Sequence, residues 1–168
     1  MRTSTAAAGS SVFFALAPGV VAGVVPWWLT GWASMPAPLV VRALGALVLV
    51  MSAAVLLHAF ARFVREGVGT PAPVAPTAHL VVGGLYRHVR NPMYVAVVGA
   101  VVGQALLLGQ FGLLVYAALL QAIFVAFVRG YEEPTLRRQF GPEYDAYRAA
   151  VPGWWPRARP ARLPRAMS

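Results

Sequence analysis

Four long apolar stretches constrain this chain more than any other feature of its sequence. Each is close to the roughly 20 residues that an α-helix needs to cross about 30 Å of hydrocarbon. The stretches are Val12–Leu29, Leu39–Phe63, Met93–Leu108 and Phe111–Val128. Because backbone N–H and C=O groups in lipid must pair internally, each stretch is predicted to be a helix. We therefore expect an all-α fold, a polytopic membrane bundle with about four transmembrane helices.

The composition agrees with a chain whose solvent is largely lipid. Of the 168 residues, 59% are hydrophobic and 11% are charged, whereas a soluble domain carries about 25% charged residues. The chain contains no Cys, which excludes disulfides, thiolate nucleophiles and Cys-ligated zinc or iron–sulfur centres. With only three His in the chain, we expect no metal site.

The arginines predict an orientation for the bundle. They are concentrated between the second and third stretches and after the fourth, while the connections Thr30–Pro38 and Gly109-Gln110 carry no charge. The positive-inside rule then places residues 64–92 and 129–168 in the cytoplasm. Gly109-Gln110 is short enough to predict a tight antiparallel hairpin of the third and fourth helices. Since many of the arginines flank membrane spans, we expect membrane lipid and no nucleic acid as a partner.

We expect the protein in a bacterial inner membrane, with its active site and C-terminus on the cytoplasmic side. For residues 1–25, a cleaved signal peptide remains an alternative to a first transmembrane helix. Its removal would leave the orientation of the other three helices unchanged.

Two cytoplasmic motifs precede and begin the third helix. Gly67 and Gly69 could present bare backbone N–H groups to a ligand, or they could form a helix C-cap followed by a turn. In Arg90-Asn91-Pro92, Asn is expected to cap the helix and Pro to occupy its first turn. The Arg fork at this helix N-terminus suits a carboxylate. The alternative is a capped helix whose arginines only anchor it at the headgroups.

Paired acids follow the fourth stretch. Glu132 and Glu133 lie where a helix C-terminus favours cations rather than anions. Their position is most easily explained if they hold a cationic or hydroxyl-rich ligand. An ion pair with Arg90 or Arg129 is the alternative, and both explanations can hold together.

The residues after these acids predict a cytoplasmic cover. Leu136–Val151 has apolar residues at helical spacing, interrupted at Phe140-Gly141-Pro142, and is predicted to be an amphipathic helix. It either closes a pocket over the bundle or anchors the chain at the interface. The Pro/Arg-rich tail 156–168 is expected to be disordered and to contact anionic lipid.

Taken together, these motifs resemble the integral-membrane methyltransferases, the superfamily of isoprenylcysteine carboxyl methyltransferase and phosphatidylethanolamine N-methyltransferase. The resemblance covers roughly residues 55–156. Asn-Pro-Met-Tyr from Asn91 and Glu-Glu-Pro from Glu132 look like the phospholipid enzymes. Phe-Gly-x-Glu-Tyr-x-x-Tyr from Phe140 looks like the isoprenylcysteine branch, which usually carries Arg-His-Pro where this chain has Arg90-Asn91-Pro92.

The resemblance implies S-adenosylmethionine as methyl donor, bound on the cytoplasmic side without a Rossmann sheet. It implies a cofactor site made of seven residues: Gly67, Gly69, Arg90, Asn91, Tyr94, Glu132 and Glu133. The acceptor is lipophilic or small, a carboxylate, amine or thiol. Arg129 is our candidate for orienting an anionic acceptor, and His88 is a candidate for accepting a proton from an amine or thiol.

This interpretation divides the chain into three parts. Residues 1–63 are two transmembrane helices, residues 64–155 are the methyltransferase core, and residues 156–168 are the tail. The alternative function is a non-catalytic membrane scaffold or small permease subunit whose cytoplasmic face binds a partner.

Overall fold

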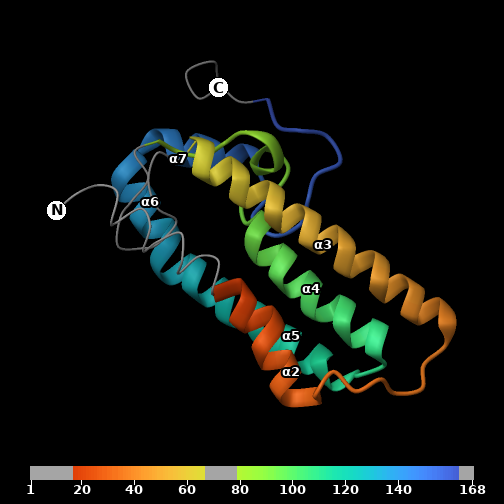
Figure 1. The fold of residues 1–168 in the computed structure, drawn as a ribbon. Helices are drawn as coiled ribbons and strands as arrows, with labels where there is room; N and C mark the ends of the chain where they lie inside the picture. The colour runs from red at the N-terminus through yellow and green to blue at the C-terminus, as the bar shows by residue number, and fades with distance from the viewer. Residues whose placement is uncertain (1–16, 67–78, 163–168) are drawn as a thin grey trace.

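The structure, a computed structural model, describes residues 17–66 and 79–162 (Figure 1). Within these ranges it is helical and contains no strand, as expected. The elements are the π-helical turn η1 (Val20–Val24), α2 (Val25–Thr30), α3 (Leu39–Glu66), the 3-10 turn η2 (Gly84–Arg87), α4 (Pro92–Leu108), α5 (Gly112–Phe127), the π-helical turn η3 (Val128–Glu132), α6 (Glu133–Phe140) and α7 (Pro142–Ala150).

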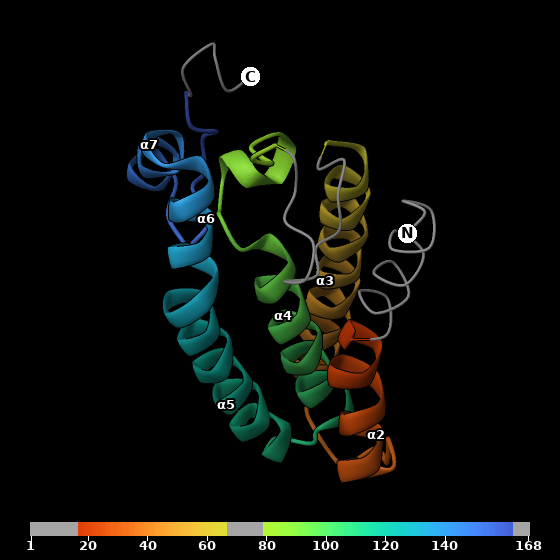
Figure 2. The same cartoon turned by 90° about the vertical axis from the view of Figure 1, so that its left-hand side faces the viewer.

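Helices α2, α3, α4 and α5 lie side by side, and α4 and α5 run antiparallel on either side of the short turn between them (Figure 2). Two helical segments, Leu39–Arg62 and Gly112–Phe140, are long and apolar enough to cross a membrane. The apolar helices Ala17–Thr30 and Pro92–Leu108 are shorter. The structure thus supports two of the four expected spans by length and composition, and the four-span topology stays a prediction.

Helices α3 and α4 form the closest helix pair because small residues line their contact. A Cβ atom added at Gly103 would lie 2.7 Å from the backbone nitrogen of Leu49. One turn earlier on α4, Gly99 faces the side chain of Ser52 in the same way. In lipid, helices associate through such close backbone packing rather than through the hydrophobic effect. The outer face of α3 remains exposed, with Leu47 and Val50 more than half accessible.

The backbone hydrogen bonding of the first described helix is interrupted at Pro26, and side chains of neighbouring helices supply the missing donors. Pro26 has no N–H for the carbonyls of Ala22 and Val21, and the N–H of Val25 already bonds to Val20 O. Gln104 Nε2 on α4 donates to Ala22 O at 2.6 Å, and the Tyr116 hydroxyl on α5 donates to Val21 O at 2.8 Å. These two side chains therefore tie the first helix to α4 and α5.

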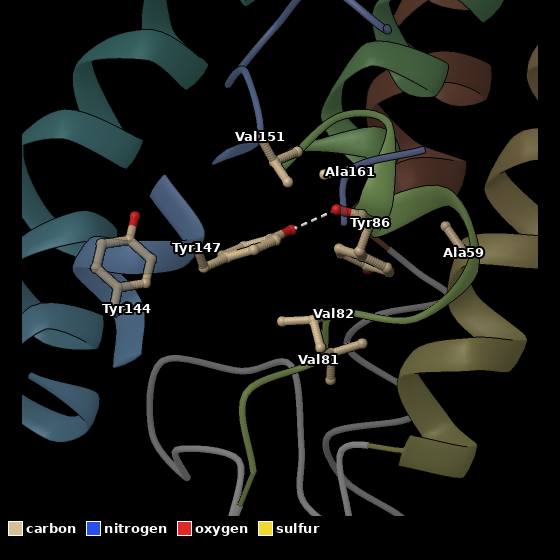
Figure 3. Packing of buried hydrophobic residues seen from close by; sticks show 8 residues of the cluster. All are labelled: Ala59, Val81, Val82, Tyr86, Tyr144, Tyr147, Val151 and Ala161. Carbon is tan, nitrogen blue, oxygen red and sulfur yellow. Dashed lines mark hydrogen bonds between the residues drawn. The ribbon is translucent and has the colours of Figure 1, made fainter. Parts of the chain in front are cut away.

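Residues of α4 and α5 form one buried core between these two helices. A second core forms at the end of the bundle opposite Thr30, where α7 packs against residues 81–86 (Figure 3). The Tyr147 hydroxyl donates to Tyr86 O at 2.7 Å, and Tyr147 is 3% exposed. Burial raises the pKa of Tyr147 well above its usual range, so the hydroxyl keeps the proton it donates. The predicted amphipathic segment is two helices, which meet at Gly141 with a φ of 51°.

The apolar stripe of this segment is buried in the second core rather than turned toward lipid. Tyr144, Tyr147 and Val151 belong to that core, with Leu136 and Phe140 against it. Of the two interpretations of Leu136–Val151, this packing favours the one in which the segment covers the bundle. The alternative, a simple interfacial anchor, would need the stripe to be exposed.

The expectation of a disordered tail is wrong for residues 156–162. Arg157 N donates to His88 O at 3.0 Å, and Ala161 N donates to Arg87 O at 2.9 Å. The Arg87 side chain returns two bonds to Ala161 O, and Ala161 is 2% exposed. Backbone pairing with a distant segment produces no periodic pattern in the sequence. The prediction therefore rested on the Pro/Arg-rich composition alone, and it was wrong for these residues. Residues 163–168 lie outside the described ranges.

We expect Gly103→Ala to destabilise the protein by about 1–3 kcal/mol, because the new methyl group must displace backbone of α3. The measurement is the midpoint of thermal unfolding in detergent. The control is Gly112→Ala, whose Cβ would meet nothing within 4 Å, and which should not lower the midpoint. Equal midpoints for the two variants would contradict the close packing of α3 on α4.

We expect the cost of Gln104→Met to depend on Pro26. In the native sequence the change leaves Ala22 O without its side-chain donor, at a cost of about 1 kcal/mol. In a Pro26→Ala background the new N–H can bond to that carbonyl, so the same change should cost less. A double-mutant cycle of unfolding free energies measures the difference. An identical cost in both backgrounds would show that Gln104 does not compensate for the missing N–H of Pro26.

Candidate functional site

Three segments meet at one end of the bundle. Arg90 and Asn91 lie immediately before α4, Glu132 and Glu133 lie at the junction of η3 and α6, and α7 continues into residues 151–154. All three lie on the side predicted to be cytoplasmic.

Arg90 and Glu133 form an ion pair. Arg90 Nη1 lies 2.7 Å from Glu133 Oε1, and their side chains are 13% and 14% exposed. The same nitrogen donates to the Tyr144 hydroxyl at 3.2 Å. On the other carboxylate oxygen, Arg148 Nη2 lies 3.4 Å from Glu133 Oε2. The predicted alternative of an ion pair with Arg90 is therefore confirmed, and both oxygens of Glu133 have a cationic neighbour.

Tyr144 contributes a neutral hydroxyl to this ion pair. Burial raises the pKa of Tyr144, and the nearby Glu133 carboxylate raises it further, while Arg90 acts in the opposite direction. A raised pKa keeps the phenol protonated at neutral pH. Tyr144 therefore accepts a hydrogen bond from Arg90 without adding a negative charge.

Glu132 has a different neighbour. The Tyr94 hydroxyl, one turn after Arg90 on α4, donates to Glu132 Oε2 at 3.0 Å. The Tyr94 ring lies against Phe124 on α5, with ring centroids 4.7 Å apart, and its centroid is 6.3 Å from that of Trp154. One acid of the pair thus belongs to a cationic cluster and the other to an aromatic one.

One polar atom in this cluster has no partner. Among the described residues, Arg90 Nε is the single buried side-chain nitrogen or oxygen without a hydrogen bond. Such an orphaned donor is uncommon, because leaving it unpaired costs free energy. Arg90 immediately precedes α4, and a helix N-terminus is the kind of position where a carboxylate is stabilised.

Asn91 serves the chain in a way that the sequence did not predict. Asn91 is the N-cap residue of α4 and Pro92 occupies the first turn, as expected, but the Asn91 side chain makes no capping hydrogen bond. Instead, Asn91 Nδ2 donates to Gly153 O at 3.1 Å. Asn91 N and Arg90 N donate to Gly153 O and Pro152 O, at 3.3 and 2.9 Å. The side-chain amide of Asn91 therefore bonds to a distant chain segment instead of capping its own helix.

The other predicted site residues lie apart from this cluster or outside the description. His88 Nδ1 is 2.8 Å from Arg157 O, which places its contact on the tail. Arg129 is exposed at the start of η3. Gly67 and Gly69 lie outside the described residues. The structure therefore brings together Arg90, Asn91, Tyr94 and the two acids, and shows no contact of His88 or Arg129 with them.

Several residues of the cluster were not singled out from the sequence as site residues. They are Phe124, Tyr144, Arg148, Gly153 and Trp154. Tyr144 lies in the apolar stripe of the amphipathic segment, so its burial was predictable and its contact with Arg90 was not. Glycine at position 153 has a steric explanation, because a Cβ there would lie 3.1 Å from Arg90 Nη2.

Comparison with known proteins gives a family assignment. A model of the phospholipid methyltransferase family matches residues 39–143, from the first residue of α3 to the second residue of α7. No curated protein and no solved structure matches the chain at a significant level. The matched range includes Arg90, Tyr94 and both acids of the junction. Since the match covers more than half of the sequence, the chain belongs to the phospholipid methyltransferase family.

Proposed function

We propose that this protein is an integral-membrane methyltransferase that uses S-adenosylmethionine and acts on a lipid or another lipophilic acceptor at the cytoplasmic face. Family membership supports a membrane methyltransferase. The observation that carries the finer proposal is the cluster around Arg90, whose guanidinium is paired with Glu133 and keeps one buried nitrogen, Nε, without a partner.

The membrane arrangement in this proposal has four helices. The apolar helices Ala17–Thr30 and Pro92–Leu108 cross the bilayer together with the two longer segments. Their side-by-side packing supports this, as does the repair of the Pro26 carbonyls by Gln104 and Tyr116. The arginine distribution then puts the Arg90 cluster on the cytoplasmic side, where S-adenosylmethionine is available.

The residues of the cluster fit the chemistry of this cofactor. S-adenosylmethionine carries a carboxylate, an ammonium, a sulfonium and ribose hydroxyls. Arg90 would hold the carboxylate through its unpartnered Nε, since a guanidinium presents several donors in one plane. Glu132 would take the ammonium or the ribose hydroxyls. Asn91 remains part of the proposed site because it adjoins Arg90, and Gly67 and Gly69 remain part of it because of the family resemblance of their motif.

Within the acid pair we assign separate roles. Glu133 already has Arg90 and Arg148 on its two oxygens, so it positions Arg90 more than it contacts the cofactor. Glu132 has a neutral partner, Tyr94, and among the described residues no arginine forms an ion pair with it, so a cationic ligand would stabilise the ionised form of this enclosed carboxyl group. Its carboxylate is therefore the better ligand for a cationic group.

When bound, S-adenosylmethionine supplies an electrophilic methyl group for an in-line displacement. The chain's own contribution is positioning and the exclusion of water. Tyr94, Phe124 and Trp154 provide an apolar wall beside the charged groups. A carboxylate acceptor needs no base. For an amine or thiol acceptor, His88 would accept the proton, and Arg129 would orient an anionic acceptor.

A scaffold without catalytic activity is the second candidate. The observation that favours it is that Arg90, Glu133 and Asn91 already have hydrogen-bond partners within the chain. A structural network needs no ligand. Binding of S-adenosylmethionine separates the two candidates, because a scaffold has no reason to retain it.

We expect Glu132→Gln to weaken S-adenosylmethionine binding by about tenfold or more, because a charge-assisted hydrogen bond contributes about 1.5–3 kcal/mol. Isothermal titration calorimetry on the purified full chain measures the affinity. Glu143→Gln is the matched control, since Glu143 is an exposed acid on α7. Equal affinities for both variants would remove Glu132 from the site. Failure of the unmodified protein to bind in detergent and in nanodiscs would favour the scaffold.

We expect Glu133→Gln to lower the free energy of unfolding by about 1.5–3 kcal/mol, because two arginines lose their charged partner. Thermal unfolding in detergent measures the change. Asp145→Asn is the control, because Asp145 pairs with Arg137 at 2.7 Å while both side chains are about half exposed, and such pairs contribute little. If Glu133→Gln unfolds at the midpoint of the unmodified protein, its positioning role is wrong.

A further inference from the structure

The segment Val151–Arg162, here called the strap, follows α7 and is fixed to the start of α4 and the residues before it. Its carbonyls at Pro152 and Gly153 accept the N–H groups of Arg90 and Asn91. Farther along, its N–H groups at Arg157 and Ala161 donate to the carbonyls of His88 and Arg87. The course of the strap is therefore set by backbone pairing, whatever its side chains contact.

The strap carries an exposed Trp among exposed arginines. Trp155 is 84% exposed, and among the described residues after Tyr131 it is the one large apolar side chain that the protein leaves uncovered. Arg157, Arg159 and Arg162 follow it and are exposed, and Val151–Arg162 contains no acid. Transfer of this ring from water to an apolar or interfacial environment would be favourable.

The level of the strap along the bundle indicates which environment that is. Gly153 contacts Asn91, which immediately precedes the apolar helix α4. Trp155 is two residues farther on, so it lies near the level where the apolar part of α4 begins. Trp is enriched at this depth of a membrane, where its ring can lie among the headgroups.

The charges near the strap favour an anionic surface. The acids of α7 are Glu143 and Asp145, and Asp145 is paired with Arg137. Arg157 Nη1 donates to Ala150 O at 2.6 Å, and a guanidinium has further N–H donors beyond that bond. Exposed arginines next to a membrane surface attract anionic lipids, and salt weakens the attraction.

We propose that the strap is a contact surface for anionic phospholipids, in which the Trp155 ring enters the headgroup region and Arg157 and Arg159 bind lipid phosphates. The three side chains of this contact, Trp155, Arg157 and Arg159, are separate from the methyl acceptor and are not among the residues of the Arg90 cluster, to which the strap contributes Gly153 and Trp154. It does not require the protein to bind S-adenosylmethionine. The amphipathic helices do not supply it, because their apolar stripe is buried in the second core.

The absence of cysteine gives a direct experiment. Ala158→Cys places a single thiol on the strap, which is labelled with the neutral fluorophore bimane. The full chain is placed in nanodiscs of phosphatidylcholine alone or mixed with phosphatidylglycerol. Quenching by acrylamide, which is uncharged and not concentrated or repelled by lipid charge, reports the exposure of the label. We expect quenching to be about twofold lower in the anionic discs, and the difference to shrink at high salt.

Two comparisons make this result specific. Arg157→Gln with Arg159→Gln should abolish the lipid dependence, while Arg137→Gln with Arg138→Gln, an exposed arginine pair on α6, should preserve it. A label at Ser34→Cys, in the connection before α3 at the opposite end, should show no dependence. Equal quenching of the strap label in both lipids would overturn the proposal. So would a lipid dependence that survives loss of Arg157 and Arg159.

Discussion

The ion pair between Arg90 and Glu133 is the interaction on which the arrangement of this end of the molecule depends. It joins the start of α4 to the junction of η3 and α6, two points 43 residues apart. With these two segments joined, Tyr94, one turn into α4, donates to Glu132, and Arg148 on α7 lies close to the second carboxylate oxygen of Glu133. Because the pair is largely buried, loss of Glu133 would leave the charge of Arg90 without its partner, which is far more costly than loss of a surface pair.

That ion pair has a fixed position because α4 has one. The backbone of α4 lies against α3 with almost no side chain between them at Gly103, so α4 cannot slide or rotate without a clash. The strap then holds the residues just before α4 by their backbone N–H groups. Two interactions therefore fix the position of α4. Close packing on α3 acts in its apolar part, and backbone hydrogen bonds from the strap act just before its first residue.

The helices were predictable from the sequence because a helix in a lipid bilayer requires a long run of apolar residues. The approach of Arg90 to the paired acids was predictable in part, since opposite charges at one membrane face attract. The pattern Gly99-x-x-x-Gly103 was also there to be recognised as a helix-contact motif. By contrast, the use of Asn91 and the order of the strap depend on carbonyls that arrive from more than 60 residues away. No local propensity encodes them.

The interruption at Pro26 has a consequence for how the chain is assembled. The carbonyls of Val21 and Ala22 receive their donors from side chains 95 and 82 residues later in the chain. At about 5–20 residues per second, synthesis of those donors lags by roughly 4–19 seconds. In a bilayer, the first helix would hold two unsatisfied carbonyls throughout that interval. With the proposed four-helix arrangement, its stable insertion would be a late event, completed by the helices that follow it.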